Sequence, residues 1–130
     1  MNQSLHCALP LALAVLAMSA RAQDPTQTDG DKYKPLLDNP CVRVLQYRDT
    51  PGDKTQQHRH PAFVLVALNA FKRHIRLPDG KVMAREFKPG DVMWSPAQTH
   101  IGENVGDTPT QALLIEMKPA TSAHAECNAQ

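Results

Sequence analysis

The sequence lacks an excess of either charge, because 14 lysine and arginine residues stand against 13 aspartate and glutamate residues and the formal net charge is +1. It also lacks a basic stripe with interleaved aromatic residues, the pattern typical of nucleic-acid-binding surfaces. After the first 22 residues we find no apolar stripe at helical spacing and no internal repeat. These absences argue against a nucleic-acid partner, a helical bundle and a repeat architecture.

The only long apolar run lies at the N-terminus. Residues 7–18 are nearly all apolar, and Ala20-Arg21-Ala22 matches the small-x-small cleavage site of a secretory signal peptide. The run is shorter than the roughly 20 residues that a membrane-spanning helix needs, and the six residues before it contain no lysine or arginine. We predict a signal peptide over residues 1–22, with an uncleaved anchor as the alternative. The mature protein is then periplasmic or secreted, with no stable membrane span.

The remaining residues, 23–130, suffice for one domain. Residues 23–36 are polar and rich in turn formers, which predicts a flexible arm before a folded domain over residues 37–119 and a tail over residues 120–130. Cys41 and Cys127 are the two cysteines left after cleavage, and an oxidising compartment permits them to pair. Otherwise Cys41 is a small buried apolar residue and Cys127 a thiol in the tail.

Short β-branched and apolar segments recur between turns, which predicts an all-β sandwich or barrel. The expected strands are Cys41–Tyr47, His58–Leu68, Phe71–Leu77, Lys81–Phe87, Val92–Trp94, His100–Asn104 and Gln111–Met117.

Three of the six histidines have the spacing of a metal site. His58 and His60 are separated by one residue, so on a strand they point to the same face, about 6.6 Å apart at roughly 3.3 Å per residue. His100, from a distant strand, would complete a set of three imidazoles that suits Fe, Zn, Cu, Ni or Co and leaves coordination positions open. The alternative is a polar interior in which the three side chains only form hydrogen bonds. His74 lies between Lys72 and Arg76 and is expected to be exposed.

The motifs around these histidines resemble those of the cupin superfamily. Gly52, five further residues and His58-Arg59-His60 match the first cupin motif, and Gly90, Pro96, His100 and Asn104 match the second, over roughly residues 41–117. Within that superfamily, the chain resembles the small single-domain, RmlC-like cupins linked with β-alanine degradation. The resemblance implies a double-stranded β-helix, or jelly-roll barrel, a metal held by His58, His60 and His100, and a homodimer.

The sequence departs from the cupin pattern at the fourth ligand. Val64 or Leu65 stands where the motif has a glutamate. Glu103 is expected to face away from His100, because it lies three positions further along the strand and successive residues alternate between faces. The faces of Glu86 and Glu116 cannot be assigned, so a site of three histidines without a carboxylate is the simplest interpretation.

Other side chains receive weaker assignments. Phe87 and Trp94 are expected in the core, and Gln98 is close enough in sequence to His100 to reach the surroundings of the metal. A carboxylate ligand would be bound by whichever of three arginines faces the interior: Arg43, Arg73 or Arg85.

Two functional hypotheses follow. The first is a metal-dependent enzyme with an oxygenase-like reaction on a small polar or acidic molecule, and the second is a non-catalytic module that binds or senses a metal or small ligand. A barrel without metal is a third, weaker reading. No catalytic residue beyond the metal ligands can be named, because the lining expected from the motifs (Phe63, Leu65, Met93 and Trp94) offers few proton donors.

Overall fold

A computed structural model describes residues 23–120 and Cys127. The predicted signal peptide, residues 1–22, and most of the predicted tail lie outside the described residues. One short helix, α2 (Pro25–Thr28), precedes nine strands, which are β1 (Tyr33–Asp38), β2 (Val42–Asp49), β3 (His58–His60), β4 (Phe63–Ala67), β5 (Phe71–Arg76), β6 (Val82–Phe87), β7 (Val92–Ser95), β8 (Gln98–Asn104) and β9 (Thr110–Met117). In the part of the chain that is described, no helix has the length and apolarity needed to cross a membrane.

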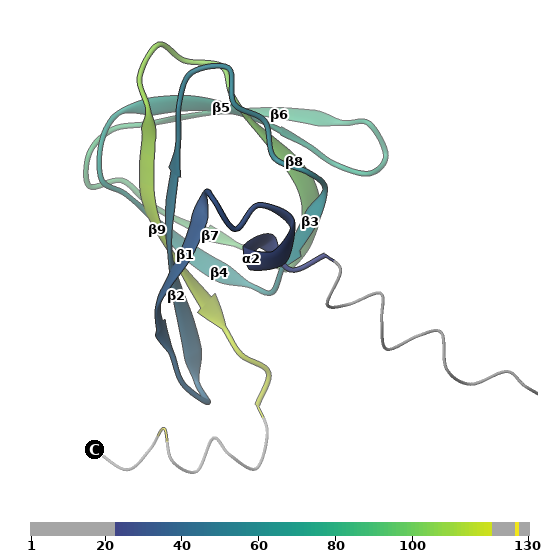
Figure 1. Cartoon of the computed structure of the whole chain (residues 1–130), viewed down its shortest axis with the longest axis vertical. Coiled ribbons are helices and arrows are strands. Elements are labelled where there is room, and N and C mark those ends of the chain that lie inside the picture. Colours follow the sequence, from purple (N-terminus) through teal and green to yellow (C-terminus); the bar gives the residue numbers. More distant parts are fainter. Residues whose placement is uncertain (1–22, 121–126, 128–130) are drawn as a thin grey trace, which may run out of the picture.

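The strands form two antiparallel sheets that curve around a shared interior (Figure 1). The larger sheet has the order β1-β2-β9-β4-β7, and the smaller has the order β3-β8-β5-β6. Neighbours in the larger sheet come from opposite ends of the chain, as where β2 pairs with β9 over eight residues. The predicted all-β jelly-roll barrel is confirmed.

The expected strand is interrupted after His60, and the two strands that result belong to different sheets. We expected one strand from His58 to Leu68, but β3 belongs to the smaller sheet and β4 to the larger. Pro61 lies at the break and has no backbone N–H to donate to a ladder. The carbonyl of Ala62 instead accepts from the N–H of Met117 at 2.8 Å, which starts the pairing of β4 with β9.

The segment expected to be a flexible arm has regular structure, so that expectation is wrong for residues 24–36. Asp24 caps α2 by accepting a hydrogen bond from the Thr26 N–H at 2.9 Å, and Pro25 occupies the start of the helix, where proline is favoured. β1 then pairs with β2, with Tyr33 opposite Tyr47. Polar turn formers therefore act as a helix cap here, and an edge strand accommodates Pro35.

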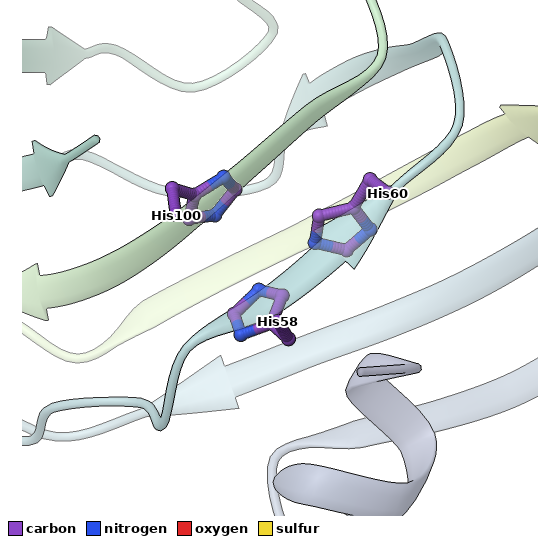
Figure 2. Close-up of side chains that lie close together, drawn as sticks. All are labelled: His58, His60 and His100. Atoms are coloured by element: carbon purple, nitrogen blue, oxygen red, sulfur yellow. The ribbon is translucent and has the colours of Figure 1, made fainter. Parts of the chain in front are cut away.

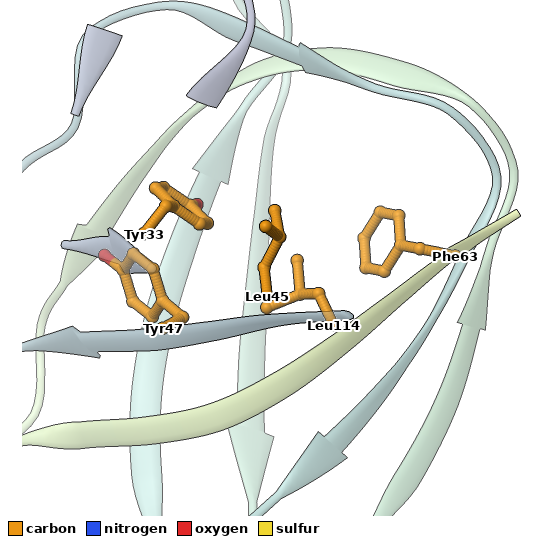
Figure 3. Packing of buried hydrophobic residues seen from close by; sticks show 5 residues of the cluster. All are labelled: Tyr33, Leu45, Tyr47, Phe63 and Leu114. Carbon is orange, nitrogen blue, oxygen red and sulfur yellow. The ribbon is translucent and has the colours of Figure 1, made fainter. Parts of the chain in front are cut away.

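The core lies between the sheets. One buried cluster consists of Tyr33, Leu45, Tyr47, Phe63 and Leu114 (Figure 3). A second consists of Ala67, Phe71, Phe87 and Ala112, which confirms the expectation for Phe87.

Trp94 contradicts its expected place in the core, because 60% of its surface is exposed. It lies opposite Val64 in the β4–β7 ladder, whereas the neighbouring inward positions pair Leu65 with Met93. Successive residues of a strand face opposite sides, so Trp94 belongs to the outer face of the larger sheet.

Candidate metal centre

The barrel brings the three predicted histidines together. His58 and His60 extend from the same face of β3, and His100 lies directly opposite His58 in the adjacent strand β8 (Figure 2). One nitrogen atom from each ring lies within 4.8 Å of the others, and all three side chains are buried. A pair of hydrogen-bonded strands therefore sets the geometry of the whole group.

The hydrogen bonds of His58 define its tautomer. Its Nδ1 lies 2.9 Å from the carbonyl oxygen of Gln56, which can only accept, so Nδ1 carries the proton. The lone pair of Nε2 then points to the interior, where the Tyr33 hydroxyl donates to it at 3.2 Å. Asp29 Oδ2 lies 3.6 Å from Nδ1 on the outer side of the ring. His58 is thus oriented as a ligand through Nε2.

His60 is held by a buried carboxylate. Its Nδ1 lies 2.6 Å from Glu116 Oε1, and the other oxygen of Glu116 accepts from Arg43 Nε, also at 2.6 Å. Arg43 in turn forms an ion pair with Asp24 at 2.8 Å. A carboxylate behind a histidine fixes the ring and makes its far nitrogen a better ligand.

Two buried ring nitrogens of the group have no hydrogen-bond partner among the described residues. These atoms are Nε2 of His60 and Nδ1 of His100, and both are buried. Buried polar atoms are normally satisfied, so an unpaired nitrogen at the centre of a histidine cluster indicates a position for a ligand or ion. The donor set fits a transition metal.

Burial also keeps two of the rings neutral. Burial first, and then the neighbouring imidazoles, lower the pKa of His58 to about 4 and that of His100 to about 2. A neutral imidazole can donate its lone pair to a metal, whereas an imidazolium cannot. Burial alone would raise the pKa of Glu116, but the hydrogen bonds from His60 and Arg43 hold it below its usual value.

Several solved structures are similar to this chain. A cupin domain from Bordetella pertussis Tohama I is 27% identical, with a TM-score of 0.62 over 67% of this chain and 92% of that one. An RmlC-like cupin with a double-stranded β-helix fold from Methanocaldococcus jannaschii is 12% identical, with a TM-score of 0.54 over 74% of this chain and 84% of that one. The chain therefore has the cupin fold, and its resemblance to the cupin superfamily is confirmed.

A third similar structure is the DMSP lyase DddQ from Ruegeria pomeroyi DSS-3, which is 18% identical, with a TM-score of 0.54 over 73% of this chain and 51% of that one. No family model and no curated protein sequence matches this cupin.

No carboxylate takes the fourth position of this cupin among the described residues, since the group of potential ligands consists of the three histidines. Leu65 lines the interior at the place of the missing glutamate, and Val64 faces outward opposite Trp94. Glu103 pairs with His74 on the outer side of β8, as expected. Glu116 lies behind His60, so it acts on the site through that ring.

The arginines and Gln98 have other partners in this cupin. Arg73 is buried, lines the interior and binds Asp49, while Arg85 also lines the cavity but is exposed. Arg43 supports Glu116 from outside the cavity. Gln98 donates to Ser95 Oγ at 2.9 Å. His74 is exposed, as its charged neighbours predicted.

Sequence reasoning missed the contribution of the N-terminal segment to the site. Tyr33 from β1 and Asp29 from the turn after α2 both lie beside His58. Asp24-Pro25 was a usable signal, because an aspartate followed by proline is typical of a helix start. The aromatic side chain of Tyr33 followed by Leu36 and Leu37 was a weaker sign of a strand.

Replacing Glu116 with glutamine is expected to weaken metal binding about 10- to 100-fold, the usual effect of losing such a carboxylate behind a ligand. The glutamine keeps the size of the side chain but removes the charge that supports His60 Nδ1. Competition with a chromophoric chelator measures the dissociation constant. Glu103→Gln is the matched control because Glu103 faces away from the site, and equal losses in both variants would contradict the assigned role.

Proposed function

We propose that this cupin binds one divalent transition metal ion per chain through His58, His60 and His100 and holds a small molecule at the positions left open. The observation that carries the proposal is the pair of buried, unpartnered nitrogens on His60 and His100 beside the inward Nε2 of His58. A metal with three protein ligands retains room for water or another molecule, in contrast to a closed structural site. When bound, a redox-active metal would supply oxygen chemistry, and zinc would supply Lewis-acid chemistry.

Metal titration tests the proposal. The purified chain is stripped with a chelator and dialysed separately against Zn, Co, Ni, Cu and Fe(II), and bound metal is measured by plasma mass spectrometry. We expect one equivalent in the wild type and a trace amount in a His58→Ala/His60→Ala variant. His74→Ala is the control, because His74 is an exposed histidine of the same barrel. Equal trace metal in all three proteins would refute the site.

Binding is the better supported activity, and catalysis is a second candidate. The acidic groups near the interior are already committed, with Glu116 bound to His60 and Asp49 bound to Arg73. Few side chains remain to move a proton, so an oxygenase-like reaction would depend on the metal and its open positions. Oxygen consumption by the Fe(II)-loaded chain with candidate organic acids would indicate an enzyme, and its absence would indicate a binding module.

We further propose that the protein works in the periplasm or outside the cell. The sequence of residues 1–22 motivates this location, and the disulfide between Cys41 and Cys127, whose Cα atoms lie 6.0 Å apart, supports it. Disulfides persist in oxidising compartments and are rare in the cytosol. Cell fractionation locates the protein, and its recovery from the cytosol alone would refute this assignment.

We also propose a homodimer that buries the outer face of the larger sheet. Val44, Ile115, Val64 and Trp94 form an apolar row across β2, β9, β4 and β7. Antiparallel sheets usually present polar side chains to water on one face, and exposed apolar patches often mark an interface. Sedimentation analysis is expected to give a dimer for the wild type and a shift toward monomer for Trp94→Gln. A wild type that is monomeric at micromolar concentration would contradict the interface.

A further inference from the structure

The interior cavity beside the histidines has the size of a small-molecule site. Its volume is about 430 Å³, within the range of roughly 300–1,000 Å³ that is usual for such sites. Most of its lining side chains are apolar, and they come from both sheets, as shown by Phe63, Leu65, Phe71, Ile75 and Met83. A hydrated, polar molecule would lose its hydrogen bonds to water against these walls.

Most polar side chains of the same cavity are already paired. Arg73 donates to Asp49, Thr110 and Tyr47, and Gln98 donates to Ser95. The buried nitrogens without partners belong to His60 and His100. The cavity can therefore recognise a polar group at the histidine end and an apolar group along its walls.

The charge of the metal site favours an anionic group at the histidine end. Three imidazoles bring no negative charge, and the potential ligands that the described residues gather include no carboxylate. The negative charge of Glu116 lies behind His60 and is shared with Arg43 at 2.6 Å. A divalent ion in this buried place therefore keeps most of its positive charge, which an anionic oxygen ligand would compensate.

We propose, building on the metal site proposed above, that the ligand is an organic anion with one metal-binding oxygen group and an apolar alkyl or aryl body. The oxygen group binds at the histidines, and the body lies along the side chains of Leu65, Ile75 and Met83. This ligand class is narrower than the small polar or acidic molecule expected from the sequence, because the apolar walls disfavour a ligand that is polar throughout.

A series of alkyl hydroxamates tests the proposal. Acetohydroxamate, hexanohydroxamate and octanohydroxamate carry the same metal-binding group on apolar chains of increasing length. Calorimetric titration of the zinc-loaded chain is expected to show affinity rising about three- to fourfold per added methylene until the cavity is filled. The heat-capacity change of binding should become more negative along the series, which marks apolar burial.

Two variants locate the apolar body. Met83→Gln places a polar group of similar length in the wall and should flatten the dependence on chain length. Val82→Gln is the matched control, because Val82 is the exposed neighbour on the same strand, β6, and does not line the cavity. Circular dichroism verifies that both variants are folded.

The outcomes separate this inference from the metal site itself. If zinc binds stoichiometrically but all three hydroxamates bind equally, the ligand class is refuted and the metal site stands. If the chain-length dependence is the same without zinc, or if Met83→Gln and Val82→Gln behave alike, the proposed arrangement of the ligand is refuted. Failure to bind zinc at all would overturn both proposals. The metal titration detects this failure before any hydroxamate is added.

Discussion

Replacing Arg73 with methionine is expected to lower the free energy of unfolding by about 3–5 kcal/mol, because removing one partner of a buried ion pair leaves the other charge uncompensated. Arg73 Nη1 donates to Asp49 Oδ2 at 2.5 Å and to Thr110 Oγ1 at 3.0 Å, and Nη2 donates to the Tyr47 hydroxyl at 2.9 Å. Both charged side chains are buried between the sheets. Urea denaturation followed by circular dichroism measures the loss.

Arg85→Met is the matched control. Arg85 lies opposite Arg73 in the β5–β6 ladder but is exposed, and its one hydrogen bond among the described residues is to the sulfur of Met83. Exposed substitutions of this kind usually change stability by about 0.5 kcal/mol or less. Similar losses in the two variants would show that the Arg73–Asp49 pair has no special role.

The same pair has a defined pH dependence. Burial alone would raise the pKa of Asp49, but the charge of Arg73 and the hydrogen bonds from Tyr47, Thr110 and Arg73 hold it below its usual value. A carboxylate whose pKa is lowered by folding stabilises the protein above its unfolded pKa of about 3.9, and this stability is lost as the pH falls through the folded pKa. The difference between wild type and Arg73→Met should therefore shrink below about pH 4.

Replacing Cys127 with serine is expected to cost about 2–5 kcal/mol of unfolding free energy, the usual effect of removing a native disulfide. The bond joins Cys41, directly before β2, to Cys127 across 86 positions of sequence. A disulfide that closes so long a loop restricts the unfolded chain. Removing the disulfide therefore raises the conformational entropy of the unfolded state. Thermal denaturation with and without a reductant measures the effect.

The cysteine variants also provide their own controls. Cys41→Ser, Cys127→Ser and the double variant should lose the same stability, and a reductant should have little further effect on any of them. Losses that add in the double variant would mean that each thiol contributes separately, which would contradict the disulfide.

The grouping of the three histidines could be predicted from sequence because it depends on local geometry. His58 and His60 share a face on any regular strand. His100 joins them because its strand pairs with theirs and places its side chain on the same face of the sheet. The inward-facing residues of β5 could be predicted in the same way, since Phe71, Arg73 and Ile75 alternate with polar residues and do line the cavity.

Other features depend on strand pairing and could not be predicted. β9 is apolar on both faces, so its sequence does not indicate that Glu116 faces the histidines while Ile115 faces outward. Trp94 lies on a strand of four residues, too short for its alternation to show a face, and its pairing with Val64 places it on the outside. The contact of Tyr33 with His58 depends on the edge strand β1. The sequence of this strand and of the polar turn residues before it resembles a linker.

The histidines and most of the apolar wall of the cavity lie on different strands of the barrel. The three histidines belong to the β3–β8 ladder, whereas much of the apolar wall comes from β4, β5, β6 and β9. Substitutions in the wall can therefore alter which molecule fits while the spacing of the three nitrogens stays the same. For protein engineering, this cupin offers a fixed arrangement of three histidines, and the apolar wall on the other strands can be repacked around it.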